Sequence, residues 1–262
     1  MIWQYTIIIV FLIIPESLRQ IGILLMNCST MNYRKLIILP IYNQERFLKK
    51  SIPLLKNINS DVLLIDDGST DHTYDVITEY SWLMYIKHSQ KLGSGASFIT
   101  AYEYARDLNY DVIISLDHRN IRYAEEISQL MDNISYGYDI VNSSRILENF
   151  NYHHIPQHHI DATAELSGTI NNLTGFDLTD PLSGIKALRT ESLKNMELTE
   201  FNHGLYLQIW IQAFYFGLNI IEIPAQSGIG FGEELRMYND PLNLFLSILH
   251  SEKCLYNKNS IN

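Results

Sequence analysis

Apolar runs and helical segments alternate along most of this chain, and that alternation limits the fold more than any other feature. Short apolar runs typical of buried strands occupy residues 36–40, 61–66, 82–86 and 111–117. Segments with apolar residues at helical spacing follow them, as in residues 45–57. Strands joined through helices need crossover connections, so we predict an α/β fold with a mostly parallel central sheet.

The second half of the chain continues the pattern less regularly. A fifth strand is expected at residues 138–144, and another at 219–224. We expect helices over 161–174, over 203–217 and over the amphipathic segment 240–252. No internal repeat and no linker interrupts the sequence. A single domain over residues 31–262 is therefore predicted, with 31–145 and 146–262 as its two halves.

Composition excludes some classes of protein. The formal net charge is -10 and the pI is near 5.3, which argues against non-specific nucleic-acid binding because such proteins need a basic surface. The two cysteines, Cys28 and Cys254, lie near opposite ends and fit neither a disulfide framework nor a zinc site. A reducing, cytoplasmic setting is the expected location.

The first thirty residues differ from the rest of the chain. Their apolar runs, residues 5–14 and 21–26, are each shorter than the ~18 apolar residues that a membrane-spanning helix needs. Neither a basic segment before the run nor a small-residue cleavage site after it marks a signal peptide. We interpret residues 1–30 as an apolar extension outside the folded domain, and a membrane-touching anchor is the alternative.

Polar side chains stand where the predicted strands end. Asp66 and Asp67 close the second strand, Asp117 closes the fourth, and Arg145 follows the fifth. Ligands of parallel sheets bind at the carboxyl ends of the strands, so these side chains mark the expected site. In "LIDDGSTDHT" the two carboxylates can accept hydrogen bonds from a ribose or a base, or Ser69 and its neighbours can simply cap a helix.

Two further segments border the same edge of the sheet. "LPIYNQERF" places Tyr42 and Glu45 directly after the first strand, either facing a nucleotide or stabilising the start of a helix. "KLGSGASF" opens a helix with Gly93 and Gly95. These glycines allow either a phosphate cradle of backbone N–H groups or tight packing of the helix.

Taken together and in this order, "LPIYNQE", "LLIDDGSTDHT", "KLGSGAS", "ISLD", "SSR" and "DPLSGIKALR" resemble the family 2 glycosyltransferases. The resemblance covers roughly residues 35–224, and within the family the motifs are most similar to those of the dolichol- or polyprenyl-phosphate sugar transferase branch. It implies the GT-A nucleotide-sugar-binding fold, a three-layer sandwich around a mostly parallel sheet. It also implies a GDP- or UDP-sugar donor and inverting transfer.

The resemblance assigns roles to individual residues. Those expected to bind the donor nucleotide are Pro40, Tyr42, Glu45, Asp66, Asp67, Lys91 and Gly93. Asp117 matches the first aspartate of the family's Asp-x-Asp site, which holds Mg²⁺ or Mn²⁺ on the diphosphate. Arg145 and Asp180 are expected near the transferred sugar or the acceptor. Asp180 is the best carboxylate candidate for a general base with a hydroxyl acceptor.

The chain departs from the family at the second aspartate, where it carries Arg119. Hard cations prefer oxygen ligands, and a nearby Arg119 would repel them. Two unit charges ~4 Å apart interact by ~4 kcal/mol at an effective dielectric constant of ~20. Three interpretations stay open. Arg119 neutralises the diphosphate in place of the metal; a metal binds through Asp117 and the donor phosphates; or the site has lost activity.

A second departure lies downstream, where residues 225–237 carry no basic residue before Arg236 although the branch usually has a basic segment there. This departure disfavours a lipid-phosphate acceptor in particular and leaves the donor site untouched. A lipid-phosphate acceptor and a glycan or hydroxyl acceptor therefore both stay open, in cell-envelope or glycoconjugate synthesis. The expected location is the cytoplasm, with peripheral contact at the inner face of the membrane as a variant. The alternatives are an inactive nucleotide-sugar-binding relative and a nucleotidyltransferase. The latter is disfavoured because "PIYNQERF" lacks glycine.

Overall fold

We describe a computed structural model of the chain for residues 32–116, 124–147, 157–225 and 240–259. The chain divides into a short N-terminal unit, Met1–Tyr33, and a large unit, Arg34–Asn262, which contains every helix and strand discussed below. Nearly all of the first unit lies outside the described residues, so the predicted extension over residues 1–30 stays a prediction. No helix among the described residues is both long and apolar enough to cross a membrane.

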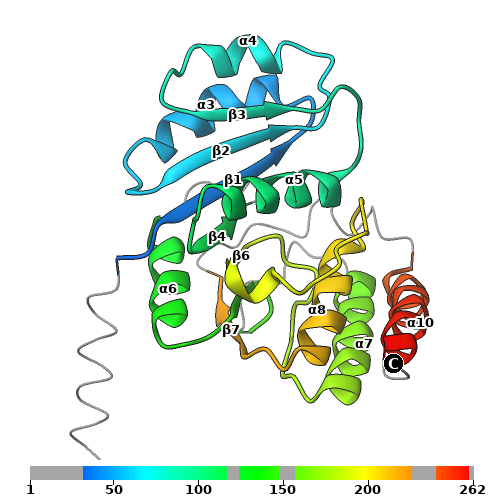
Figure 1. Cartoon of the computed structure of the whole chain (residues 1–262). Coiled ribbons are helices and arrows are strands. Elements are labelled where there is room, and N and C mark those ends of the chain that lie inside the picture. The colour runs from blue at the N-terminus through cyan, green and yellow to red at the C-terminus, as the bar shows by residue number, and fades with distance from the viewer. Residues whose placement is uncertain (1–31, 117–123, 148–156, 226–239, 260–262) are drawn as a thin grey trace, which may run out of the picture. The chain divides into compact units, whose positions relative to one another are not determined.

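Seven strands of the large unit form one sheet in the order β3-β2-β1-β4-β6-β5-β7 (Figure 1). They are β1 (Lys35–Ile41), β2 (Asp61–Asp66), β3 (Met84–Lys87), β4 (Val112–Ser115), β5 (Ile140–Ser144), β6 (Lys186–Arg189) and β7 (Ile220–Pro224). The helices are α3 (Glu45–Leu55), α4 (Thr73–Thr78), α5 (Ser94–Asp107), α6 (Ala124–Ser135), α7 (Gln157–Thr174), α8 (Leu205–Tyr215) and α10 (Pro241–Asn259), with a 3₁₀ turn, η3 (Glu191–Leu193).

The mostly parallel sheet is confirmed, with one exception. β6 runs antiparallel to both of its neighbours, β4 and β5, whereas the other pairs are parallel. The amino end of β6 therefore lies at the carboxyl ends of the parallel strands. Lys186, its first residue, pairs with Ser115 and Asn142. The residues before β6, including Asp180, are brought to the same edge of the sheet.

Helices cover both faces of the sheet, as the three-layer prediction requires. Neighbouring residues of a strand point to opposite faces. On β5, Asn142 contacts Lys186, whose ammonium lies over the Trp210 ring of α8, while Ser143 contacts Glu126 of α6. α6 and α8 thus lie on opposite faces. α5, α7 and α10 join α8 around one apolar core.

That core explains why α8 is so apolar. Leu205, Trp210 and six other residues of the helix are buried. α8 ends at Tyr215, and Gly217 then takes a φ of +64, a conformation that favours glycine after a helix. Phe245 and Ile248 of α10 are buried in the same cluster. Both segments therefore act as core, as their patterns favour.

Several helices differ from their predicted bounds; α10, for example, extends to Asn259 where an end at residue 252 was predicted. α4 begins only at Thr73, not near Ser69, because the Ser69 hydroxyl accepts the N–H of Asn43 at 2.8 Å instead of capping the helix. α7 begins at Gln157, four residues earlier than predicted. Pro53 lies inside α3, which ends two residues later at Leu55.

Candidate active site

The loops that follow β1 and β2 are joined by hydrogen bonds at the carboxyl edge of the sheet. Asn43 takes a φ of +52, and its side-chain oxygen accepts the N–H of Thr70 at 2.9 Å. The N–H of Gln44 donates to the Thr73 hydroxyl at 2.9 Å. Asp71 accepts N–H groups from both Thr73, at 3.0 Å, and Glu45, at 3.3 Å. These bonds fix the loops against each other.

Asp66 is fully buried at the end of β2 and is bonded within the protein. Its carboxylate accepts the N–H of Ser69 at 2.7 Å and the hydroxyl of Tyr85 at 2.9 Å. Burial and the Asp66 carboxylate raise the pKa of Tyr85, so the phenol stays protonated and donates. The ammonium of Lys87 lies 3.6 Å from the same carboxylate. Asp66 therefore shapes the turn through Gly68.

Asp67 fixes the glycine-rich loop that precedes α5. One oxygen accepts the N–H of Leu92 at 2.8 Å and lies 2.9 Å from Nδ1 of His88. The other oxygen accepts the N–H of Gly93 at 2.8 Å. Gly93 has a φ of +113, which favours glycine. The structure thus brings two predicted donor residues, Asp67 and Gly93, into direct contact.

Two other predicted donor residues meet in front of this loop. The ammonium of Lys91 lies 4.1 Å from the centroid of the Tyr42 ring, within the range of a cation–π contact. Pro40 lies at the end of β1, opposite Ile65 of β2. Glu45 opens α3, and its carboxylate lies 3.8 Å from the ammonium of Lys49. All the predicted donor residues therefore gather at the ends of β1 and β2.

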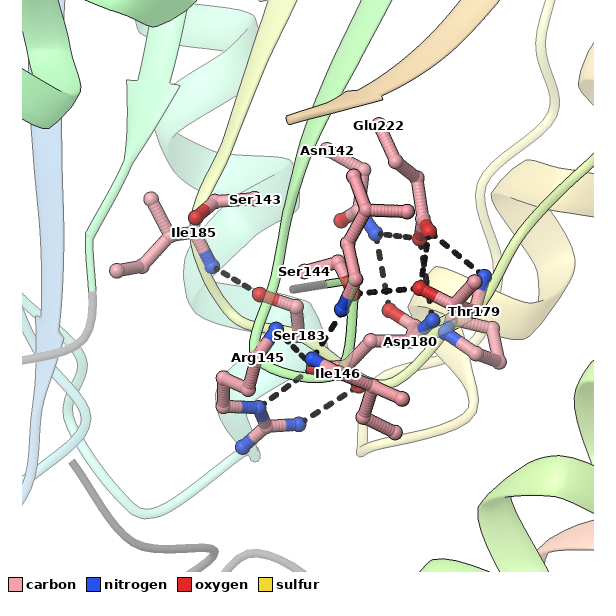
Figure 2. Close-up of polar contacts among 12 residues, drawn as sticks. Asn142, Ser143, Ser144, Arg145, Ile146, Thr179, Asp180, Ser183, Ile185 and Glu222 are labelled. Atoms are coloured by element: carbon pink, nitrogen blue, oxygen red, sulfur yellow. Dashed lines mark hydrogen bonds and ion pairs between the residues drawn. The ribbon is translucent and has the colours of Figure 1, made fainter. Parts of the chain in front are cut away.

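Arg145 and Asp180 form a buried ion pair beyond the end of β5, as Figure 2 shows. Nε and Nη2 of Arg145 donate to the two carboxylate oxygens at 2.6 and 2.9 Å, and the backbone N–H of Arg145 donates at 3.1 Å. The Asp180 side chain is 0% exposed and the Arg145 side chain 11%. In this arrangement Asp180 holds Arg145 and has no exposed surface. The arrangement disfavours the general-base role expected for Asp180.

Glu222 of β7 supports that ion pair through the residues next to Asp180, although the sequence did not predict it. It accepts the N–H and the hydroxyl of Thr179, both at 2.6 Å, and the N–H of Asp180 at 3.1 Å (Figure 2). Nδ2 of Asn142 donates to it at 2.6 Å. Burial raises the pKa of Glu222, the hydrogen bonds from Thr179 lower it, and the Asp180 carboxylate raises it further.

Lys186 continues this network toward the end of β4. Its fully buried ammonium donates to Oδ1 of Asn142 at 2.6 Å and to the carbonyl of Ser183. It also lies 4.5 Å from the Tyr206 ring centroid, and the Tyr206 hydroxyl lies 3.1 Å from that of Ser115. The buried ammonium of Lys186 thus lies beside β4, the strand that leads to Asp117. The sequence did not predict this feature.

Asp117 and Arg119, the remaining predicted site residues, lie outside the described residues. Within the described part of the chain, no three His, Cys, Asp or Glu side chains are grouped as a metal site. The fit of Mg²⁺ or Mn²⁺ at Asp117 therefore stays an expectation, and no step of the proposed transfer depends on it.

Comparison with known proteins decides the family. The model of glycosyl transferase family 2 matches residues 36–196, more than half of the chain and both halves of the site described above. The chain belongs to this family. The glycosyltransferase predicted from the sequence is thereby confirmed, as is its likeness to the polyprenyl-phosphate sugar transferases, because curated relatives carry such names.

Two of these relatives cover most of the enzyme. The UDP-N-acetylglucosamine--dolichyl-phosphate N-acetylglucosaminyltransferase of Methanococcus voltae is 26% identical over 73% of this chain and 84% of its own length. The polyprenol monophosphomannose synthase of Mycolicibacterium smegmatis is 24% identical over 73% of this chain and 76% of its own.

Solved structures of glycosyltransferases share the fold. Glucosyl-3-phosphoglycerate synthase from Mycobacterium tuberculosis, solved with Mn²⁺ and UDP, superposes with a TM-score of 0.63 at 19% identity, covering 88% of this chain and 84% of that one. Mannosyl-3-phosphoglycerate synthase from Rubrobacter xylanophilus has a TM-score of 0.64 at 15% identity, covering 90% and 78%. The predicted GT-A fold is confirmed.

Proposed function

We propose that this enzyme transfers a sugar from a GDP- or UDP-sugar to a polyprenyl phosphate, with inversion at the anomeric carbon. An acceptor phosphate oxygen bonds to the anomeric carbon, the bond from that carbon to the donor diphosphate breaks, and the nucleoside diphosphate leaves. The name of the Methanococcus voltae relative supports a UDP-sugar donor and a dolichyl-phosphate acceptor, and the name of the Mycolicibacterium smegmatis relative supports a polyprenol-linked product.

The burial of Asp180 carries the choice of acceptor. A hydroxyl acceptor needs a base that can reach its proton, whereas a phosphate is already ionised. Asp180, the sequence's best candidate for that base, is fully buried and bound at both oxygens by Arg145. An acceptor that needs no base fits this arrangement, and the guanidinium fixed by Asp180 is a cation suited to a phosphate.

The donor nucleotide is expected at the ends of β1 and β2, against Tyr42 and Lys91. Lys91 supplies a positive charge there for the diphosphate, whose negative charge grows as the sugar leaves. Asp66 and Asp67, both buried, shape the loops that surround the expected nucleotide position. A lipid acceptor would bring the enzyme to the inner face of the membrane as a peripheral protein of cell-envelope synthesis.

An acceptor panel tests this proposal. The purified full chain is incubated with UDP-glucose, UDP-N-acetylglucosamine or GDP-mannose and with a short polyprenyl phosphate, a polyprenol or a soluble glycan. We expect product only with the polyprenyl phosphate. By NMR, the anomeric configuration of the product should be opposite to that of the donor. Transfer to the polyprenol or glycan instead would overturn the acceptor class.

The second candidate is a nucleotide-sugar-binding relative without transfer activity, favoured by Arg119 in place of the second aspartate. Such a protein would bind a donor but neither transfer nor hydrolyse it. Release of nucleoside diphosphate in the same panel would exclude it.

A further inference from the structure

The segment between η3 and α8, residues 197–203, packs directly on the donor loop although about a hundred residues separate the two. A Cβ atom added at Gly95 would lie 2.2 Å from the carbonyl oxygen of Glu200 and 2.6 Å from that of Asn202. One added at Gly93 would lie 2.3 Å from the carbonyl oxygen of Phe201. These glycines therefore allow close packing of the two segments. The N–H of Ala96 donates to the carbonyl oxygen of Phe201 at 2.9 Å, so it is not available to bind a phosphate, as the alternative interpretation of this loop would need.

Two glutamines of α8 hold the other side of this segment. Oε1 of Gln208 accepts the N–H groups of Thr199 at 2.9 Å and Glu200 at 3.1 Å. Oε1 of Gln212 accepts the N–H of Glu197 at 2.9 Å. Both glutamines donate to the buried carboxylate of Glu252 in α10, at 2.7 Å from Gln208 and 3.1 Å from Gln212.

The consequence is a fixed position for His203, the last residue of the segment. Nδ1 of His203 lies 3.2 Å from the hydroxyl of Ser94, the first residue of α5. Burial lowers the pKa of His203, and the nearby Lys91 ammonium lowers it further. The imidazole is therefore neutral at pH 7 and carries one N–H donor and one nitrogen acceptor.

His203 thus reaches the donor side from the other half of the chain. It contacts the hydroxyl of Ser94, which follows Gly93. Besides burial, the charge of Lys91, whose ammonium contacts the Tyr42 ring, lowers the pKa of His203. Side chains from the loop after β1, the loop before α5 and the start of α8 meet there. Lys91 supplies charge, and the neutral imidazole supplies a hydrogen bond of fixed direction.

We infer that His203 is a donor-binding residue that hydrogen-bonds the diphosphate of the nucleotide-sugar beside Lys91. This inference rests on the proposed function, since it needs a nucleoside-diphosphate donor. The segment 197–202 acts as its support, held by Gln208 and Gln212 on one side and by Gly93 and Gly95 on the other. Precise placement matters because a hydrogen bond weakens steeply with poor distance or angle.

Equilibrium binding of UDP and GDP to the full chain tests the inference without requiring turnover. The variants are His203→Ala, His203→Phe, which keeps a ring but removes both nitrogens, and His203→Gln, which keeps an N–H. The control is His250→Ala, on the exposed side of α10. Thermal melting of each variant shows whether it is folded. If His203→Ala is unfolded, the binding measured for His203→Phe decides the test.

We expect His203→Ala and His203→Phe to bind the preferred nucleotide about tenfold more weakly, the loss of one hydrogen bond to a charged group. His203→Gln should recover part of that loss, and His250→Ala should match the wild type. Folded Ala or Phe variants that bind within twofold of the wild type would overturn the role of His203 alone. A wild-type chain that binds neither nucleotide would overturn the donor class as well.

Discussion

Replacing Asp180 with asparagine should destabilise the enzyme far more than an ordinary surface substitution. The substitution keeps the size of the side chain but removes its negative charge, and the new amide group would face the guanidinium of Arg145. The wild-type carboxylate accepts three hydrogen bonds from Arg145, at 2.6, 2.9 and 3.1 Å, with no exposed surface. Asp180→Asn therefore removes the negative charge that Asp180 supplies to a largely buried cation.

The expected magnitude follows from that burial. Removing one partner of a buried ion pair costs ~3–5 kcal/mol, whereas an exposed pair contributes ~0–1 kcal/mol. For a domain of this size, each kcal/mol lowers the melting temperature by about 2–4 °C. Asp180→Asn should thus lower the free energy of unfolding by ~3–5 kcal/mol and the melting temperature by roughly 6–20 °C.

Urea unfolding followed by circular dichroism measures the change, with Asp177→Asn as the matched control. Asp177 lies three residues earlier in the same loop and is exposed, so its substitution should stay within about 0.5 kcal/mol. A double-mutant cycle with Arg145→Gln should give a coupling energy of about 1–3 kcal/mol. A loss below about 1 kcal/mol for Asp180→Asn, or additive single mutants, would refute the argument that this carboxylate serves to hold Arg145.

Four further predictions follow, three from the described contacts and one from the sequence at positions 117 and 119. Gly95→Ala should destabilise the fold and weaken nucleotide binding, since its Cβ would lie 2.2 Å from the Glu200 carbonyl oxygen. A Cβ added at Gly168 would meet no atom within 4 Å, so Gly168→Ala should stabilise α7 by up to about 1 kcal/mol in urea unfolding. Equal changes in stability for Gly95→Ala and Gly168→Ala would contradict this. Burial raises the pKa of Glu126 above 4.5, so its stabilising contribution is full below pH 4.5 and is lost as pH rises through the raised pKa. From about pH 4.5 to 8 the urea midpoint of the wild type should therefore fall relative to that of Glu126→Gln, which has no carboxyl group to ionise. A difference in midpoint that stays constant with pH would contradict this. If Arg119 takes the place of a metal ligand, adding EDTA should weaken UDP binding less than about tenfold; a hundredfold loss in calorimetry would show a strong metal site instead.

β1, β2 and β4 were predictable because each contains a short, uninterrupted apolar run. β2, Asp61–Asp66, has the predicted bounds, and the donor-side polar residues follow from where β1 and β2 end. The direction of β6 was not predictable. Its four residues, Lys186–Arg189, carry no signal for parallel or antiparallel pairing, which depends on contacts with β4 and β5. The start of α4 was misplaced because Ser69 bonds to a residue 26 positions away.

The polar residues inside the second half escaped prediction because their partners are remote in sequence. Glu222 interrupts the apolar run of β7, and a lone carboxylate among isoleucines is a signal that could have marked it. Gln208 and Gln212, four residues apart in an apolar helix, carry a similar signal. Lys186 and His203 carry none, since their roles arise only where β6 and α8 reach the donor edge of the sheet.

Transfer of label from donor to lipid tests the central claim most directly. The full chain is incubated with a nucleotide-sugar labelled in the sugar and with a polyprenyl phosphate, and the label extracted into organic solvent is measured. Asp117 matches the first aspartate of the family's Asp-x-Asp site. If it is a charged group of the active site, we predict labelled lipid with the wild type and about a hundredfold less with Asp117→Asn. Label that stays in water with the wild type, or equal lipid labelling by Asp117→Asn, would contradict the account.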